Sequence, residues 1–173
     1  MFFYHEDIRI GIGFLEDNIC SIVLGTKAEV NQQFQDLEDK YGPERLINEA
    51  MGFSKVRQLS DLYTLTWEDV CGYLMNLNCH EMQTFTPFQI SVLKAIFEIP
   101  KGSTKTYKEL AEAVGKPKAF RAVASVCVQN PFALLIPCQR VVPTDSKKFP
   151  GEYRWGAELK KIMLQKEKFE VFQ

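Results

Sequence analysis

Two apolar segments with β-branched residues lie near the start of the chain. Residues 8–15 read Ile-Arg-Ile-Gly-Ile-Gly-Phe-Leu, and residues 19–24 read Ile-Cys-Ser-Ile-Val-Leu. The polar run Glu16-Asp17-Asn18 separates them. Two short segments of this kind joined by a few polar residues are typical of a β-hairpin. The pattern therefore predicts a hairpin here.

The apolar spacing changes after residue 43. Pro43-Glu44-Arg45 precedes Leu46, Ile47 and Met51, which fall at intervals close to those of one helix face. This spacing predicts a helix that begins at Pro43. Strands followed by helices make the first part of the chain a small α/β domain.

A second helix is predicted further along the first half. Thr66 is a good N-cap, and the apolar residues that follow it are Val70, Tyr73 and Leu74. Residues 76–85 are polar and show little pattern. We therefore place a domain boundary there, between residues 1–80 and residues 86–173.

Three helices are predicted in the second half. Thr86 and Pro87 combine an N-cap with a proline at the first helical position, and this helix ends before Pro100. Its apolar face consists of Phe88, Val92, Leu93, Ile96 and Phe97. A second helix ends at Gly115. Its apolar face consists of Tyr107, Leu110, Ala111 and Val114. The third helix extends from Lys118 to Val128.

The last two of these helices are joined by a tight turn that contains Gly115, which is typical of a helix-turn-helix. The second helix of the pair carries Arg121 on an otherwise small and apolar run. An ordinary helical hairpin fits the same pattern. The choice between them depends on the charge of this half of the chain.

Charge is distributed unevenly along the 173 residues. Residues 1–85 carry 6 Lys+Arg and 14 Asp+Glu, a net −8, whereas residues 86–173 carry 15 Lys+Arg and 8 Asp+Glu, a net +7. A basic module indicates an anionic partner, although a solvated basic face is the simpler alternative. Together with the helix pair, this charge favours DNA binding.

Composition excludes several classes of protein. Hydrophobic residues make up 46% of the chain, yet no apolar run is long enough to span a membrane. The first residues lack the basic and apolar regions of a signal peptide. Five cysteines without framework spacing indicate free thiols in a reducing, intracellular setting. We expect a cytoplasmic protein, or a nuclear one in a eukaryote, and no membrane partner.

A metal site is not expected. The candidate ligands Cys20, Cys71, Cys79 and His80 lack the spacing of a zinc site.

Cys138 is the cysteine in the most distinctive setting. It follows Pro137, precedes Gln139 and Arg140, and lies inside an apolar segment. Proline presets a turn, and a neighbouring cation favours a thiolate. A reactive thiol is one interpretation, and a small buried hydrophobe is the other. The remaining cysteines, including Cys127, have no such setting and are interpreted as core residues.

A basic helix-turn-helix followed within ten residues by a turn-held cysteine suggests chemistry on DNA. Atoms inside a duplex are out of reach, so enzymes of this kind rotate the target nucleotide out of the stack. Arg121 is the natural side chain to fill the gap.

Several dispersed motifs resemble the O6-alkylguanine-DNA alkyltransferase family, also named methylated-DNA–protein-cysteine methyltransferases. The resemblance extends from Thr86 to Glu167, about half of the chain. The matching residues, in order, are Thr86-Pro87-Phe88-Gln89, Ile99-Pro100-Lys101-Gly102, Thr106-Tyr107, Arg121-Ala122-Val123, Asn130-Pro131, Leu135 to Val142, Tyr153, Gly156, Lys160 and Glu167.

The resemblance implies a two-domain fold and a DNA repair activity. The first domain is expected to be an RNase H-like α/β cap, and the second to be mainly α, of winged-helix and helix-turn-helix type. Cys138 would accept the alkyl group of a flipped O6-alkylguanine in double-stranded DNA, once per molecule. No cofactor is needed, because the thiol itself is the acceptor. We expect a monomer.

The resemblance also assigns chemical roles. Tyr107 would donate to the guanine or to a phosphate, Asn130 would tie down the segment that carries Cys138, and Glu167 would orient residue 139. The expected substrate-binding residues are Arg121, Val141, Val142, Tyr153 and Lys160. The expected DNA-binding residues are Thr86, Tyr107, Ala119, Arg121, Ala122, Ser125 and Arg140.

Gln139 departs from the family pattern, which has histidine there. Histidine removes the thiol proton through a water molecule, whereas a glutamine amide can hold that water but cannot accept the proton. Loss of a general base costs about 10²–10⁴-fold in rate. We therefore expect a slower transferase.

The third helix departs from the pattern as well. Glycines and a small residue are usual where Ala124, Ser125 and Val126 stand. Phe120 occupies a place that is usually small, and Val128 replaces a residue that is often basic. A helix that enters a minor groove needs small residues for close approach. Two alternatives stay open: a binder of alkylated DNA that performs no transfer, and a transcription regulator in which Cys138 is a sensor.

Overall fold

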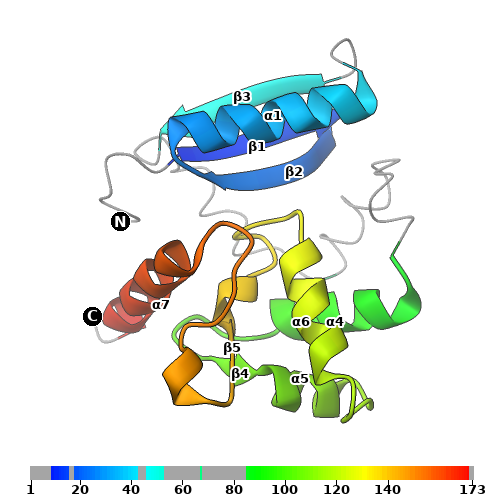
Figure 1. Cartoon of the computed structure of the whole chain (residues 1–173), viewed down its shortest axis with the longest axis vertical. Helices are drawn as coiled ribbons and strands as arrows, with labels where there is room; N and C mark the ends of the chain where they lie inside the picture. The colour runs from blue at the N-terminus through cyan, green and yellow to red at the C-terminus, as the bar shows by residue number, and fades with distance from the viewer. Residues whose placement is uncertain (1–8, 16–17, 43–45, 53–66, 68–84, 172–173) are drawn as a thin grey trace. The chain divides into compact units, whose positions relative to one another are not determined.

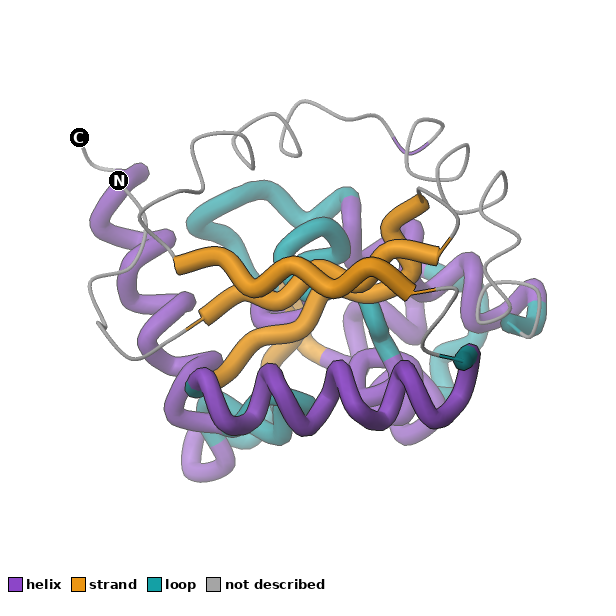
Figure 2. The backbone as a smooth tube through the Cα atoms, turned by 90° about the horizontal axis from the view of Figure 1, so that it is seen from above, coloured by secondary structure: helices purple, strands orange, loops and turns teal. Residues whose placement is uncertain are grey.

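The computed structural model describes residues 9–15, 18–42, 46–52, 67 and 85–171 (Figures 1 and 2). The chain divides into two compact units. The first unit contains residues 1–84 together with 131–135, and the second contains residues 85–130 together with 136–173. The chain therefore passes from the second unit into the first at Pro131 and returns to the second at Ile136.

The predicted hairpin is confirmed. Strands β1 (Arg9–Leu15) and β2 (Asn18–Gly25) pair antiparallel, with a register irregularity after Gly13. In this register Ile12 lies opposite Ile22. The hairpin forms one edge of a three-stranded sheet in the order β2-β1-β3.

The helix predicted from Pro43 is wrong. Residues Leu46–Gly52 form strand β3, which pairs antiparallel with β1 from Leu15 opposite Leu46 to Arg9 opposite Gly52. A short apolar run fits a helix face or a strand equally well. Pairing settles the matter here, because β1 has a second edge of N–H and C=O groups that need partners.

Helix α1 (Lys27–Tyr41) covers one face of this sheet (Figures 1 and 2). Thr26 and Glu29 form a capping box, in which Glu29 N–H donates to Thr26 Oγ1 at 3.3 Å and Thr26 N–H donates to Glu29 Oε2 at 2.7 Å. Val30 and Phe34 pack against Val23 of β2. Helix α1 is not among the predicted helices, although its Thr-x-x-Glu start is a recognisable signal.

The segment Pro131–Leu135 is bound to strand β2. The Ile22 N–H donates to the Pro131 carbonyl at 2.9 Å, and the Ala133 N–H donates to the Ile22 carbonyl at 3.2 Å. These two bonds form a parallel bridge between Ile22 and the fully buried Phe132. They hold the backbone between Asn130 and Ile136 in place.

The second unit contains the three predicted helices and one more. They are α4 (Pro87–Phe97), α5 (Tyr107–Ala113), α6 (Phe120–Gln129) and α7 (Ala157–Val171). A short parallel pair of strands, β4 (Lys105–Thr106) and β5 (Val141–Val142), completes the unit. Helices α4, α5 and α6 contact one another. Their buried core consists of Val92, Leu93, Ile96, Leu110, Ala111, Val123 and Val126.

Helix boundaries follow local chemistry. Thr86 begins α4 through a capping box with Gln89, as the sequence predicts. Helix α6 begins at Phe120, two residues later than predicted, because the chain makes a turn in which the Ala119 N–H donates to the Lys116 carbonyl at 2.8 Å. Gly115 has φ +70°, a conformation that favours glycine and lets the chain leave α5.

Some predictions lie outside the described residues. These are the helix capped by Thr66, of which only Trp67 is described and is helical, the boundary at 76–84, and the cysteines and histidine at 71, 79 and 80. In the part of the chain that the structure describes, no helix is long and apolar enough to cross a membrane.

Candidate active site

Cys138 begins a short 3-10 helix, Cys138–Arg140, directly before β5. Pro137 precedes it, and the Cys138 N–H donates to the Ile136 carbonyl at 2.8 Å. The thiol is buried, with 1% of the residue exposed. The predicted turn is therefore present, and the polar and basic residues that follow Cys138 are buried with it.

Asn130 connects the end of α6 to the cysteine. Its side-chain Nδ2 donates to the Ile136 carbonyl at 2.8 Å and to Cys138 Sγ at 3.2 Å. Asn130 is fully buried. One side chain thus contacts the backbone before Cys138, the contact that the resemblance implies, and also gives the sulfur a hydrogen-bond donor that was not predicted.

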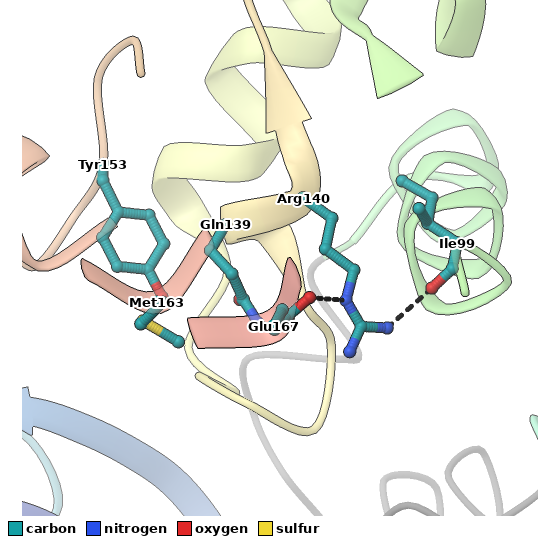
Figure 3. Close-up of polar contacts among 6 residues, drawn as sticks. All are labelled: Ile99, Gln139, Arg140, Tyr153, Met163 and Glu167. Atoms are coloured by element: carbon teal, nitrogen blue, oxygen red, sulfur yellow. Dashed lines mark hydrogen bonds and ion pairs between the residues drawn. The ribbon is translucent and has the colours of Figure 1, made fainter. Parts of the chain in front are cut away.

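Gln139, Arg140 and Glu167 form a buried polar group (Figure 3). Gln139 Nε2 donates to Glu167 Oε1 at 2.9 Å, and Arg140 Nε donates to Glu167 Oε2 at 2.8 Å. Glu167 therefore orients residue 139 and also pairs with the neighbouring guanidinium. Within the described part of the chain, the buried Gln139 Oε1 accepts no hydrogen bond.

Arg140 does not have the environment expected from the sequence. Its Nη1 donates to the Ile99 carbonyl at 2.6 Å, so the guanidinium lies between Ile99 and Glu167 (Figure 3). Only 5% of the residue is exposed. The structure therefore does not support a DNA contact by Arg140. Its charge is paired with a carboxylate, which makes it a poor candidate for the cation that favours the thiolate.

Lys160 is the cation whose charge acts on the thiol. It projects from α7, and its Nζ donates to the Val141 carbonyl at 2.6 Å and to the Glu152 carbonyl at 3.2 Å. The ammonium lies 5.9 Å from the ring centroids of both Tyr107 and Tyr153. Burial lowers the pKa of Lys160, and the nearby thiols oppose that shift.

Burial dominates the acidity of the thiol. It raises the pKa of Cys138, while the hydrogen bond from Asn130 and the charge of Lys160 act in the opposite direction. Cys127 has the same dominant effect: burial raises its pKa, and the charges of Cys138 and Lys160 also act on it.

Cys127 is a neighbour of the site that the sequence analysis interpreted as a core residue only. It lies on α6 three positions before Asn130, hence about one helical turn from the residue that contacts the Cys138 sulfur. That spacing is visible in the sequence once Asn130 is assigned to the site.

Two tyrosines line the lysine. Tyr107 is the first residue of α5, and burial raises its pKa. The hydroxyl of Tyr153 donates to Met163 Sδ at 3.8 Å (Figure 3). The Tyr153 ring packs edge-on against Trp155, with 5.1 Å between the ring centroids. The structure thus brings Tyr107 of α5 and Tyr153 together at Lys160 of α7.

The predicted DNA-binding residues of α6 lie apart from this interior group. Arg121, Ala122 and Ser125 are exposed, and Ala119 is the N-cap. The Arg121 guanidinium lies 6.0 Å from the ring centroid of its exposed neighbour Phe120. An exposed arginine on a helix is free to meet a partner.

Thr86 lies at the opposite end of this surface. It caps α4, which is linked to the last turn of α6 by the hydrogen bond from Gln89 Nε2 to Gln129 Oε1 at 3.0 Å. Arg121 and Gln129 are eight residues apart, about 12 Å along the helix.

Comparisons with known proteins agree with this geometry. Residues 87–169 match the family model described as 6-O-methylguanine DNA methyltransferase, DNA binding domain. A probable methylated-DNA–protein-cysteine methyltransferase of Acanthamoeba polyphaga mimivirus is 51% identical over 83 residues, which are 48% of this chain and 54% of that protein. The matches to the first relatives thus span about half of their length or less.

Two relatives match over most of their length. The methylated-DNA–protein-cysteine methyltransferase of Methanothermobacter thermautotrophicus is 32% identical over 164 residues, 94% of this chain and 81% of that protein. The crystal structure of O6-methylguanine-DNA methyltransferase from Pyrococcus kodakaraensis superposes with a TM-score of 0.66 at 25% identity, covering 96% of this chain and 95% of that one. The chain therefore belongs to the methylated-DNA–protein-cysteine methyltransferase family.

Proposed function

We propose that this protein repairs DNA by transferring an alkyl group, such as methyl, from O6 of guanine irreversibly to its own Cys138. The observation that supports this most directly is the buried Cys138 thiol, held by Asn130 at 3.2 Å inside the region that matches the family model. The activity is that of a methylated-DNA–protein-cysteine S-methyltransferase acting once per molecule.

The proposed step balances without a cofactor. The Cys138 sulfur attacks the alkyl carbon, an S–C bond forms, and the bond between that carbon and O6 breaks. The thiol loses a proton and the departing guanine gains one. The product is a thioether, so Cys138 no longer has a thiol that can react. This is why each molecule would act once.

Gln139 would affect the rate of alkyl transfer and not its product. Its Nε2 is committed to Glu167, so Oε1 is the atom that remains to hold a water molecule near the sulfur. An amide oxygen does not accept a proton at neutral pH. We therefore propose that residue 139 positions water but is not the general base.

The guanine pocket is proposed to lie around β5 and Tyr153. The Val141 carbonyl already accepts the Lys160 ammonium at 2.6 Å, which favours the Cys138 and Val142 carbonyls as acceptors for the guanine amine. Tyr107 keeps its proton because burial raises its pKa, so its hydroxyl can donate to the guanine or to a phosphate.

DNA is proposed to meet the α5–turn–α6 motif in its minor groove. Arg121 is exposed and would fill the space left by the flipped nucleotide, while Ala122 and Ser125, which are also exposed, would contact the groove. Thr86 and Ala119 would contact the backbone. We infer a winged-helix type for residues 86–173 and an RNase H-like cap for residues 1–80. The whole would act as a monomer in the cytoplasm, or in the nucleus of a eukaryote.

Intact mass measures the proposed transfer directly. The purified protein would be incubated with excess duplex that contains O6-methylguanine, alongside a Cys138→Ser control. We expect the wild type to gain the mass of one methyl group and the control to gain none. The control also excludes methylation at the neighbouring Cys127.

A second function is favoured by one observation, the glutamine at position 139. A protein that binds alkylated DNA without transfer would flag the lesion for another pathway. Tight lesion-selective binding with no gain of mass would establish that function. Sequence-specific binding without a lesion would instead support a transcription regulator.

A further inference from the structure

The N-terminal end of α6 exposes a large apolar side chain among positive charges. Phe120 is the first residue of the helix and is 46% exposed. Its neighbours Lys116, Lys118 and Arg121 are exposed as well. The first turn of α6 contains no acidic residue, and the positive end of the helix dipole lies there. The surface around the ring is therefore suited to an anionic partner.

Phe120 belongs to an apolar strip along α6, formed with Ala124 and Val128. These residues follow one another at intervals of four, so their side chains lie next to one another on the helix surface. The exposed large hydrophobic residues in the described part of the chain are Phe120, Val128 and Phe149. Two of the three are thus on this one short helix. Exposed apolar residues that cluster inside a polar rim are typical of a binding surface.

Arg121 adds a positive charge directly beside the ring. Its guanidinium lies 6.0 Å from the Phe120 ring centroid, which is within the range of cation–π attraction. Ser125 Oγ donates to the Arg121 carbonyl at 3.3 Å, so the hydroxyl proton of Ser125 is used within the helix. The partner of this surface must therefore offer both negative charge and apolar surface. A DNA minor groove offers both, in its phosphates and in its sugars and bases.

We propose that Phe120 is a second wedge side chain, which enters the minor groove beside Arg121 and packs against the base step next to the flipped nucleotide. The inference rests on the proposed function, which supplies the DNA. Proteins that bind the minor groove frequently insert an apolar side chain, phenylalanine included, between base steps. In this arrangement Arg121 fills the gap in the stack, and Phe120 contacts the adjacent bases and sugars.

The size of Phe120 is compatible with a close approach by the rest of the helix. Side chains on an α-helix lean toward its N-terminus, so a ring at the first position extends toward the helix end. The exposed residues that follow Arg121 are the small Ala122 and Ser125. The bulky group therefore lies at the end of α6, and small groups lie along the part that faces the groove.

The salt dependence of DNA affinity tests the wedge. Fluorescence anisotropy with a labelled O6-methylguanine duplex would be measured at several salt concentrations, in the Cys138→Ser background, which has no thiol to alkylate. We expect Phe120→Ala to lower the affinity about tenfold, because a half-exposed ring loses its burial against DNA. The slope of log affinity against log salt should stay unchanged, because an apolar contact releases no counterions.

Phe149→Ala is the matched control. Phe149 is 49% exposed and follows the 3-10 helix Ser146–Lys148, outside α6. Its loss removes a ring of the same size and similar exposure, and we expect the affinity to stay unchanged. An equal loss of affinity in the two variants would overturn the proposal.

Phe120→Leu distinguishes the wedge from a general defect of the helix. Leucine is apolar, smaller than phenylalanine and a good helix former. Its affinity is therefore expected to lie between those of the wild type and Phe120→Ala, and far-UV circular dichroism checks that each variant is folded. Equal affinities of the wild type and Phe120→Ala would refute the wedge. A loss of affinity accompanied by a smaller salt slope would make the contact one with phosphate and would refute it as well.

A second copy of this chain is the other occupant to be tested. Sedimentation velocity without DNA measures the oligomeric state of the wild type and of Phe120→Ala. We expect monomers in both cases. A wild-type dimer that Phe120→Ala converts to a monomer would assign the apolar strip to self-association and overturn the proposal.

The two proposals fail separately. Intact mass after incubation with an O6-methylguanine duplex reports methyl transfer, whereas anisotropy reports the wedge. Methyl transfer by the wild type together with equal DNA affinity in Phe120→Ala would remove the wedge alone. A tenfold loss of affinity in Phe120→Ala with no methyl transfer by the wild type would keep the wedge and remove the repair function.

Discussion

The role of a side chain in this protein depends more on its partners than on its residue type. Arg140 follows Cys138 in the sequence by two positions, yet its guanidinium is paired with Glu167 and bonded to Ile99. Lys160 is 19 positions away in sequence from Val141, yet its buried ammonium donates to the Val141 carbonyl at 2.6 Å. A cation that already has a carboxylate partner contributes little to a second anion.

Gln139→His is expected to accelerate methyl transfer. Glu167 already accepts a hydrogen bond from residue 139 at 2.9 Å and would orient an imidazole in the same way. A general base typically contributes about 10²–10⁴-fold, and because burial raises the pKa of Cys138, a base at position 139 has a thiol proton to remove. Rapid-quench intact mass against an O6-methylguanine duplex measures the rate.

The matched control for that substitution is Gln139→Asn, which keeps the buried Arg140–Glu167 pair and adds no proton acceptor. It should therefore show no acceleration. An unaltered rate in Gln139→His itself would mean that thiolate formation does not limit transfer.

The polar contacts made by the helices differ widely in how deeply they are buried. Helix α7 is joined to the turn that carries Cys138 by the buried pair Arg140–Glu167. Helix α5 begins with an exposed capping box between Thr106 and Glu109. The buried contact holds the site together, whereas the exposed one stabilises a single helix end.

Glu167→Ala is expected to destabilise the fold strongly. It leaves the buried guanidinium of Arg140 without its counter-charge, which costs about 3–5 kcal/mol. Urea unfolding monitored by circular dichroism measures this loss. The exposed Glu158→Ala on the same helix is the control and should change the free energy of unfolding little. Equal stability of the two variants would contradict the buried pair.

Thr106→Ala is expected to lower the free energy of unfolding by about 1 kcal/mol, because it removes the N-cap of α5. Thr104→Ala, an exposed threonine two positions earlier, is the control. The same urea titration applies, and a loss of stability equal in both variants would argue against the cap.

The capping box also gives a pH dependence with a defined sign. Hydrogen bonds from Thr106 lower the pKa of Glu109 below its ordinary value of about 4.3. The stabilisation is therefore present above that value and is lost as the pH falls through the lowered pKa. Glu109→Gln should remove this part of the acid dependence, and urea midpoints from about pH 3 to about pH 6, a range that brackets that value, measure it.

The chain as a whole joins an acidic half to a basic half. The −8 of residues 1–85 and the +7 of residues 86–173 leave a net charge of −1. Charge of one sign is therefore concentrated in the half that contains α6, which is the arrangement expected of a DNA-facing surface.

Lys118→Ala is expected to weaken DNA binding through the loss of one phosphate contact. Lys118 is exposed just before α6. The slope of log affinity against log salt should fall by about one unit, with or without a lesion in the duplex. Lys161→Ala, on α7, serves as the control. Fluorescence anisotropy with labelled duplex at several salt concentrations measures both, and an unchanged slope for Lys118→Ala would exclude the contact.

Much of the structure of the second half can be predicted from its sequence, because the interactions that determine it are local. A capping threonine begins both α4 and α5. A proline at the first helical position also marks the start of α4, and a glycine with positive φ follows α5. The Pro137-Cys138 turn likewise depends on adjacent residues. The family motifs add the assignment of Asn130 and Glu167, whose contacts the structure shows.

Other features depend on residues that are distant in sequence. Leu46–Gly52 is a strand because β1 offers it an edge, and Pro131–Leu135 pairs with Ile22 across more than a hundred positions. Neither partner is visible in a local pattern. Packing likewise pairs Arg140 with Glu167 and brings Lys160 of α7 to the Val141 carbonyl. Local hydrogen bonds and backbone preferences depend on neighbouring residues and can therefore be predicted from the sequence. Strand pairing and the partners of buried charges are determined only when the chain packs.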